Sequence, residues 1–203
     1  MRDTPFENYP SAIVKDETGD LHDLVEETLG QRFFQDDEMN RDEFIELLKC
    51  FYHVYSPLEN RMMPVLRGTL PDYEYDPRAI RLRRDFQELG IDQQAIDGWS
   101  LASHDDLVEL PDAPELFGCL YVVEGSEMGN HVMRSQLDDM LPEDCLEANH
   151  FFRDRGEATR ERWSGFKERM NERIMTSDEL DRMVQSARET FELFRKGFEW
   201  KEN

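Results

Sequence analysis

One histidine, His22, lies in a segment whose helical periodicity places a lysine and a glutamate on the same face. Lys15 precedes it by seven residues and Glu26 follows it by four, and both spacings keep side chains near one face of a helix. The rise of a helix puts Lys15 and His22 about 10 Å apart along the axis. An imidazole there could bind a metal while the lysine pairs with an acidic group of the same ligand. The pattern alone favours a simpler interpretation, because most helical histidines and lysine–glutamate pairs are ordinary surface or core features.

A second segment, residues 120–130, carries two glycines inside an otherwise helical pattern. Gly125 and Gly129 are four residues apart, so they clear one strip of the helix for a flat ligand or a second backbone. Ser126 adds to the local disruption, and glycine-flanked kinks free backbone groups to face a ligand. Tight packing between two helices is the alternative explanation for this spacing.

Helical periodicity dominates the rest of the sequence, and glycine and proline cluster between the helical segments. We therefore predict an all-α fold, one domain over residues 1–203 in which residues 1–12 are loosely ordered. Asn40 and Glu43 form a capping pattern at the start of the second helix, and Gly30 is the expected end of the first. Short links between long helices predict an antiparallel bundle. The expected helices span about residues 13–29, 41–63, 78–89, 113–140, 156–174 and 177–200.

The chain has a formal net charge of −22, from 24 Lys+Arg against 46 Asp+Glu. A polyanion repels phosphate groups, so neither nucleic acid nor an anionic membrane is expected as a partner. No stretch reaches the roughly 18 apolar residues of a membrane span, and the N-terminus lacks the apolar core of a signal peptide. We expect a cytoplasmic protein. The three cysteines form no CxxC pair, which argues against a disulfide framework or a structural zinc site.

Several segments, in the same order and at similar spacing, resemble the haem oxygenase family. Residues 15–26 resemble the proximal helix of that family, and residues 51–59 resemble its second helix. Residues 120–130 are similar to the distal helix in bacterial members associated with phytochromes. Segments between residues 151 and 191 resemble further parts of that branch and the shared C-terminal helices. The similarity covers most of the chain and is weakest over residues 64–112.

The resemblance implies a bundle that holds haem between the proximal and distal helices. His22 corresponds to the proximal iron ligand, which binds through a neutral imidazole nitrogen, and Glu26 to the residue that orients the imidazole. Lys15 and Lys167 correspond to basic partners of the haem propionates, and Arg169 is an alternative to Lys167.

On the distal side, Gly125 and Gly129 correspond to glycines that let the helix lie against the porphyrin. Tyr55 corresponds to a tyrosine that hydrogen-bonds into the distal water network. Two positions depart from the best-known members. Ser126 stands where those members have an aspartate, and a hydroxyl anchors water more weakly than a carboxylate. Asn130 stands where another glycine is usual, so it could crowd the pocket or donate a hydrogen bond to oxygen. Both departures bear on turnover and on the position of ring cleavage.

The expected reaction is the oxidative opening of haem to biliverdin, with release of carbon monoxide and ferrous iron. Haem is then both cofactor and substrate, and the reaction consumes O2 and external electrons. The expected partners are a reductase or ferredoxin, and a phytochrome that takes up the bilin product. Because electron donors are often acidic, we expect a basic docking patch around Lys167, unless its cations are paired with the neighbouring glutamates.

Three alternatives stay open on the sequence alone. A haem carrier or sensor without turnover would explain the altered distal residues Ser126 and Asn130. A dimetal oxidase on the same fold would use the ExxH pair Glu147 and His150, although such a site needs a second pair, which the sequence lacks. A structural bundle that only binds a partner protein would bind no haem.

Overall fold

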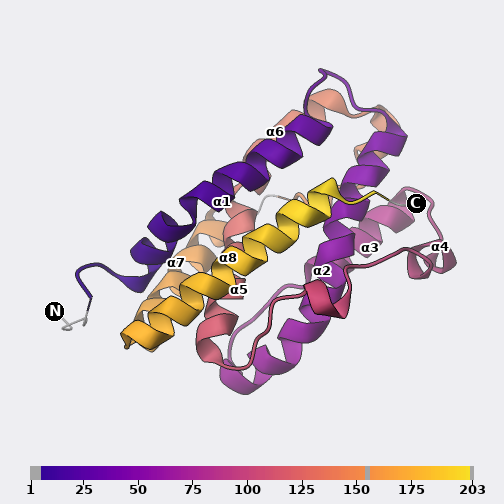
Figure 1. The fold of residues 1–203 in the computed structure, drawn as a ribbon. Helices are drawn as coiled ribbons and strands as arrows, with labels where there is room; N and C mark the ends of the chain where they lie inside the picture. Colours follow the sequence, from indigo (N-terminus) through magenta and orange to yellow (C-terminus); the bar gives the residue numbers. More distant parts are fainter. Residues whose placement is uncertain (1–5, 154–155, 202–203) are drawn as a thin grey trace.

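The computed structural model describes residues 6–153 and 156–201, apart from the side chains of Asn130 and His131. Every regular element in this part of the chain is helical, which confirms the predicted all-α class (Figure 1). The α-helices are α1 (Pro10–Phe33), α2 (Arg41–Thr69), α3 (Arg78–Glu88), α4 (Gln93–Asp97), α5 (Ala113–Gly125), α6 (Asn130–Met140), α7 (Glu157–Arg173) and α8 (Ser177–Glu199). Short 3-10 turns are η1 (His104–Asp106), η2 (Ser126–Met128) and η3 (Glu143–Cys145).

Side-chain capping fixes the starts of α2 and α8. The Asn40 side chain accepts hydrogen bonds from the backbone of Asp42 and Glu43, and the Glu43 carboxylate accepts from the Asn40 backbone at 2.8 Å. This is the capping pattern predicted for α2. A second capping box, between Thr176 and Glu179, starts α8. Reciprocal bonds of this kind satisfy backbone donors that a helix start otherwise leaves unpaired.

Two helices extend beyond their predicted ends. The prediction that Gly30 ends the first helix is wrong, because α1 continues to Phe33. Arg32 holds that last turn, since its guanidinium donates to the Phe198 carbonyl at 2.5 Å and to the Glu46 carboxylate at 2.6 Å. The predicted loop after residue 63 is likewise helical to Thr69. Burial of Leu66 in the core outweighs the local cost of the proline before it. At its other end α1 begins at Pro10, within the segment 1–12, of which residues 1–5 lie outside the description.

The central helix of the fold is α8, because α1, α2 and α5 all pack against it. The helices α1 and α8 lie side by side and run in the same direction, so the bundle is not uniformly antiparallel (Figure 1). Arg188 on α8 pairs with Asp20 on α1 at 3.0 Å. Gly118 makes the α5–α8 contact possible, since a Cβ there would collide with the Met183 carbonyl and lie 2.9 Å from the Ala187 nitrogen. Here glycine serves close helix packing.

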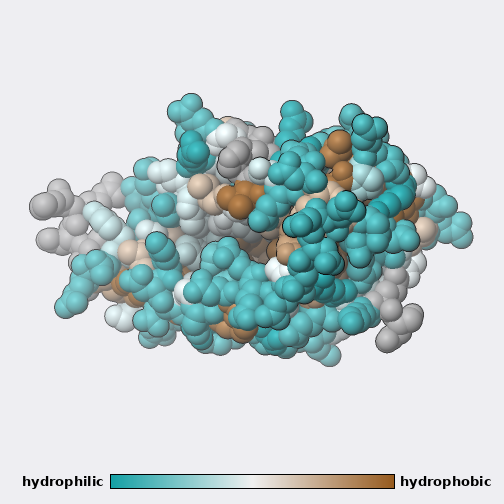
Figure 2. All heavy atoms as spheres, turned by 90° about the horizontal axis from the view of Figure 1, so that it is seen from above, coloured by the Kyte–Doolittle hydropathy of each residue, from teal (hydrophilic) through white to brown (hydrophobic). Residues whose placement is uncertain are grey.

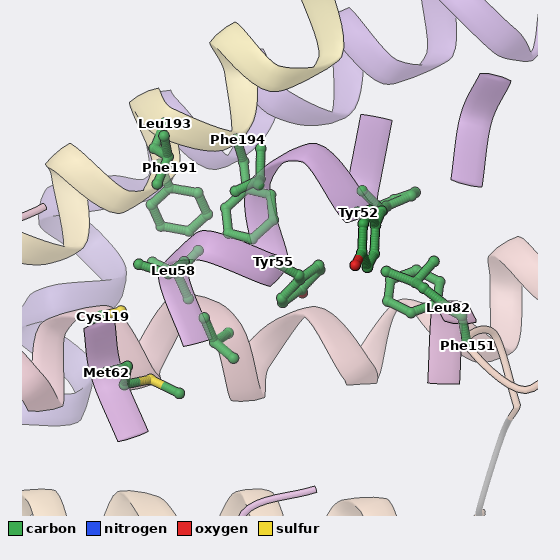
Figure 3. Close-up of a cluster of buried hydrophobic side chains, with 14 of the residues drawn as sticks. Tyr52, Tyr55, Leu58, Met62, Leu82, Cys119, Phe151, Phe191, Leu193 and Phe194 are labelled. Carbon is green, nitrogen blue, oxygen red and sulfur yellow. The ribbon is translucent and has the colours of Figure 1, made fainter. Parts of the chain in front are cut away.

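The core is rich in aromatic and large aliphatic side chains from α2, α3, α5 and α8 (Figure 3). Tyr55 on α2 packs edge-on against Phe194 of α8, with ring centroids 4.9 Å apart. Phe51 joins the same group through Phe151 at 4.7 Å. Such edge-on and tilted pairs contribute beyond the area that they bury. They also hold α2 and α8 in a fixed relation beside residues 120–130, which we call the distal segment.

None of the helices in the described residues has both the length and the apolarity that a membrane crossing requires. The three cysteines Cys50, Cys119 and Cys145 are unpaired and buried. Burial raises the pKa of the Cys119 thiol to about 12, so this residue behaves as an apolar core side chain.

Candidate functional site

His22 lies on α1 with just over half of its side chain exposed, at 53%. Its Nε2 lies 3.5 Å from the Glu26 carboxylate and its Nδ1 lies 3.4 Å from the Asp23 carboxylate. Either ring nitrogen can therefore carry its proton towards a carboxylate while the other keeps a free lone pair. The ring meets the face of Phe191 on α8 edge-on, at 6.0 Å between centroids. The structure thus supplies an accessible imidazole that is oriented by its own helix and by α8.

The distal segment is broken where the glycines predicted a break. Helix α5 ends at Gly125, η2 covers Ser126–Met128, and α6 begins at Asn130. Among the described residues beyond its chain neighbours, a Cβ on Gly129 would have only the carbonyl oxygen of Ser126 within 4 Å, at 3.6 Å. A Cβ on Gly125 would lie 3.4 Å from the ring of Trp163. Helix packing therefore explains the glycine at 118, whereas the described protein leaves the space beside Gly129 open.

Tyr55 and Ser126 are brought together across α2 and the distal segment. The Tyr55 hydroxyl lies 3.0 Å from the Ser126 Oγ, and the Ser126 hydroxyl donates to the Val123 carbonyl at 2.9 Å. A serine hydroxyl has one proton, so Tyr55 is the donor in the pair. Burial raises the pKa of Tyr55 to about 12, which keeps its proton in place at neutral pH. Ser126, which is exposed, therefore presents an accepting lone pair at its surface.

One turn of α8 links the two sides of the site. Phe191 contacts His22, and Phe194, three residues on, contacts Tyr55. The helices α1 and α5 meet where Tyr121 of α5 shares a side-chain hydrogen bond with Thr18 of α1. That bond lowers the pKa of Tyr121, whereas burial raises it by more. The next turn of each helix carries His22 and Gly125. The imidazole and the glycine break thus lie at the same level of the bundle, next to an aromatic stretch of α8.

Lys167 and Arg169, the two cations of α7 that we predicted as propionate partners, point to different parts of the protein. Lys167 lies with its Nζ 5.4 Å from the ring of Trp163, the residue that packs beside Gly125. Arg169 lies over the ring of Tyr73 at 5.9 Å, so its guanidinium points to the connection between α2 and α3. Lys15 is exposed on α1, in the same helix as His22. The geometry therefore places Lys167, rather than Arg169, on the side of the glycine break.

Several residues of the site were not found from the sequence. Arg162, which belongs to the charged stretch around Lys167 where we expected a docking patch, instead reaches the buried Glu124 at 3.1 Å. Arg78 and Arg81 of α3 also pair with glutamates of the distal segment. The matching spacing of Arg78 and Arg81 with Glu124 and Glu127, three residues in each case, is the signal that could have found them.

The pair Glu147 and His150 forms no metal-binding group. These residues lie in turns after η3 rather than on a helix, and the His150 backbone donates to Asp85. Within residues 6–153 and 156–201, the one cluster of histidine, cysteine and carboxylate groups close enough to hold a metal ion contains His22. The side chain of Asn130 lies outside the description, so its predicted role near the distal segment is not placed.

Apolar side chains reach the surface along the distal segment and just after it. Met128 is 39% exposed and Val132 is 61% exposed. Seen from above, the surface of the molecule is mostly hydrophilic, and apolar residues flank a hollow near its middle (Figure 2).

The fold and this site define an all-helical protein in which an accessible imidazole on α1 and a glycine break after α5 lie next to the same aromatic turn of α8. The sequence model of the haem oxygenase family matches residues 10–200, and the chain belongs to this family. It is therefore a haem-degrading oxygenase by family. No curated protein matches the chain at a significant level of sequence similarity.

Solved structures of haem oxygenases share the fold. The enzyme from Neisseria meningitidis, solved with NO and CO bound, is 20% identical with a TM-score of 0.72, covering 95% of this chain and 94% of that one. Haem oxygenase 2 from Chlamydomonas reinhardtii, solved without haem, is 18% identical with a TM-score of 0.64, covering 95% of this chain and 97% of that one.

The residues present fit a haem. The open side of Gly129 gives a flat macrocycle room to approach the distal backbone, and Phe191 offers an apolar wall beside the imidazole. His22 supplies a nitrogen donor of the type that haem iron accepts. Lys167 places a cation on the side of the glycine break, where a ligand carboxylate could pair with it.

Proposed function

We propose that this protein opens haem to biliverdin, carbon monoxide and ferrous iron, using O2 and electrons from a separate protein, with His22 as the iron ligand. Its main support is the shared aromatic turn of α8, which contacts His22 through Phe191 and the Tyr55–Ser126 pair through Phe194. Bound haem supplies the iron that activates O2 and the macrocycle that is oxidised.

The proximal residues hold and orient the imidazole. Glu26 and Asp23 offer carboxylate oxygens to the ring nitrogens of His22, so whichever nitrogen faces the iron, a carboxylate can accept from the other. This contact raises the basicity of the ligating nitrogen and fixes the ring plane. Phe191 limits rotation of the ring from the other side.

The distal residues provide space and a hydrogen-bonded hydroxyl pair. Gly125 and Gly129 let the backbone of the distal segment approach the macrocycle. Tyr55 donates to Ser126, which leaves Ser126 as an acceptor for water at the site. We include Asn130 as a further distal residue on the strength of its position at the start of α6.

Basic residues on two helices pair with the haem propionates in this proposal. Lys15 lies seven residues before His22 on α1, and Lys167 lies beside Trp163 on α7. Arg169 is the weaker candidate, because its guanidinium lies over Tyr73. Each pairing is charge-assisted, so it contributes orientation as well as affinity.

The protein partners follow from the chemistry. The reaction needs an electron donor, a ferredoxin or a reductase, and exposed cations of α7 such as Arg160 are candidates for its docking. We place the chain in the phytochrome-associated bacterial branch, supported by Ser126 and by the resemblance over 151–166. A phytochrome would then receive the bilin. Three unpaired, buried thiols are in keeping with a reducing compartment such as the cytoplasm.

One observation favours a second candidate, a haem-binding protein without turnover. The Ser126 hydroxyl already donates to the Val123 carbonyl, so this side chain offers no proton of its own. In that case reduced, haem-loaded protein in air would form a stable complex and make no bilin.

The test is product analysis of the haem-loaded protein with a chemical or enzymatic reductant in air. Stoichiometric biliverdin and carbon monoxide support the proposed function. A Soret band that persists without bilin supports the carrier or sensor. Protein that binds no haem would overturn both.

A further inference from the structure

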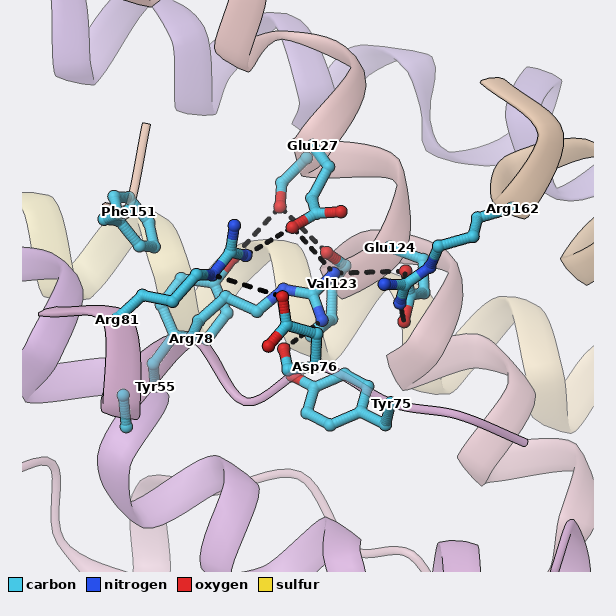
Figure 4. Close-up of polar contacts among 12 residues, drawn as sticks. Tyr55, Tyr75, Asp76, Arg78, Arg81, Val123, Glu124, Glu127, Phe151 and Arg162 are labelled. Carbon is cyan, nitrogen blue, oxygen red and sulfur yellow. Dashed lines mark hydrogen bonds and ion pairs between the residues drawn. The ribbon is translucent and has the colours of Figure 1, made fainter. Parts of the chain in front are cut away.

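Four buried charged side chains and one partly buried arginine gather around the break in the distal segment (Figure 4). Glu124 and Glu127 lie on either side of Gly125 and Ser126, and they are 4% and 7% exposed. Three arginines from two other helices approach them: Arg78, Arg81 and Arg162. Buried charges in such number need an explanation, because each loses its hydration on folding.

Arg78 and Arg81 of α3 bind Glu127, which lies at the C-terminal end of the break. Arg81 donates to the Glu127 carboxylate, and Arg78 lies 3.5 Å from the same carboxylate. Burial alone raises the pKa of Glu127, but the charges of Arg78 and Arg81 outweigh burial, and the pKa falls below its ordinary value. Glu127 is therefore ionised at neutral pH, and its two arginines fix its carboxylate.

Arg162 of α7 binds Glu124, which lies at the N-terminal end of the break. Arg162 donates to both oxygens of Glu124 at 3.1 Å, and Arg78 donates to one of them at 3.1 Å. Arg78 therefore bridges Glu124 and Glu127, and the cluster ties α3, α5, η2 and α7 together. The residues before Gly125 and after Ser126 are both anchored.

A gain in the stability of the fold does not explain these buried ion pairs well. The desolvation of buried ion pairs offsets most of their attraction, and apolar replacements are often as stable. Orientation of the backbone explains the cluster better, because the glutamates flank Gly125 and Glu127 itself lies in the 3-10 turn Ser126–Met128. A glycine and a 3-10 turn constrain the backbone less than an α-helix does. Ser126 and its partner Tyr55 depend on that backbone for their geometry.

We propose that the Arg81–Glu127 pair, joined by Arg78, is a positioning device that fixes Ser126 towards Tyr55 and thereby sets where the macrocycle is opened. The proposal rests on the proposed function for its consequence at haem. Its structural part, the fixing of residues 125–129, does not depend on haem and can be tested in the haem-free protein.

The test compares Glu127→Gln with Glu115→Gln. Glu115 is on the same helix as Glu124 and also pairs with an arginine, Arg182, at 2.6 Å, but at the far end of α5. In haem-free protein, Glu127→Gln should speed amide hydrogen exchange over residues 125–129 by about tenfold or more, and Glu115→Gln should leave that segment at the wild-type rate. In the haem complex, Glu127→Gln should shift the ratio of biliverdin isomers.

The isomer ratio separates positioning from stability, because it does not depend on the fraction of protein that is folded. A double variant, Arg81→Met with Glu127→Leu, removes the pair without leaving an unpaired buried charge. We expect this variant to regain stability while keeping fast exchange and an altered isomer ratio. Wild-type exchange and isomer ratio in Glu127→Gln, or in the double variant, would overturn the proposal. Wild-type protein that makes no biliverdin would defeat the proposed function instead, and the exchange data would still decide whether the pair fixes the segment.

Discussion

The hydroxyl of Tyr55 lies 3.0 Å from the Oγ of Ser126, and it donates its proton in that pair. The Ser126 hydroxyl donates its own hydrogen bond to the Val123 carbonyl. The chain of hydrogen bonds therefore runs from Tyr55 on α2 through Ser126 to the backbone of α5. The tyrosine is 1% exposed, whereas the serine is exposed. A buried donor is thus connected to the surface at which we propose that haem binds, through a residue that can accept a further hydrogen bond.

Replacing Tyr55 with phenylalanine removes that donor. We expect the free energy of unfolding to fall by about 1 kcal/mol, as for loss of one buried hydrogen bond. We expect haem affinity to stay at the wild-type level and the rate of biliverdin formation to fall by about tenfold or more, because proton delivery depends on positioned hydroxyl groups. The measurement is single-turnover absorbance with a fixed reductant.

The matched control is Tyr52→Phe, one turn away on α2. Tyr52 is also buried, but its ring packs against Phe86 and Trp99 rather than near Ser126. Equal rates in the two variants would remove Tyr55 from the proposed distal pair.

Two glycine substitutions should have opposite effects. Gly129→Ala adds a methyl where the described protein is open and φ is −79°, so the fold should keep its stability or gain up to about 1 kcal/mol. Haem affinity should fall, because that methyl enters the ligand space. Gly118→Ala forces a methyl into the backbone of α8 and should destabilise the fold by about 3 kcal/mol. Thermal unfolding and haem titration measure both effects, and Gly129→Ala with unchanged haem affinity would argue against the proposed distal surface.

Asp85 should make a pH-dependent contribution to stability. It is fully buried and accepts hydrogen bonds from the backbone of His150 and Phe151. Burial raises its pKa from 3.8 to about 6, against the opposing effect of those bonds. Between these values the folded state binds the extra proton, so this contribution favours folding as pH falls and is lost as pH rises through about 6.

The shift of about two pKa units corresponds to about 3 kcal/mol at most. Unfolding of wild type and Asp85→Asn should be compared between about pH 7.5 and about pH 5, where contributions of other groups largely cancel in the difference. We expect wild type to gain stability relative to Asp85→Asn as pH falls. A difference that is constant, or that moves the other way, would show that Asp85 is not held at a raised pKa.

The sequence was informative where local chemistry decides structure. The capping pattern at Asn40 and the break at Gly125 are local features, and both are present in the structure. The end of α1 was missed because Gly30 is tolerated inside the helix when Arg32 binds the Phe198 and Trp200 carbonyls at the C-terminal end of α8. Contacts of that kind join residues far apart in the chain, so helix periodicity does not reveal them.

The buried charges were missed for a related reason. Arg162 lies in a charged stretch of α7 that is typical of a solvated face, and only the packing of α7 against the distal segment brings it to Glu124. Gly118 was likewise not singled out, although close packing of α5 against α8 requires a glycine there. The residues of the proposed haem site come from the family resemblance, which adds information that spacing alone lacks, and their roles at haem stay predictions.

We propose that His22 binds haem iron in a working haem oxygenase. The most direct measurement is the absorbance of wild type and of His22→Ala with one equivalent of hemin, before and after reductant is added in air. His22 is half-exposed, so the exchange should leave the fold intact. We predict that the Soret band of wild type decays into the broad red absorption of biliverdin, and that His22→Ala makes no biliverdin unless imidazole is added. Biliverdin formation by His22→Ala at the wild-type rate, without imidazole, would contradict the account.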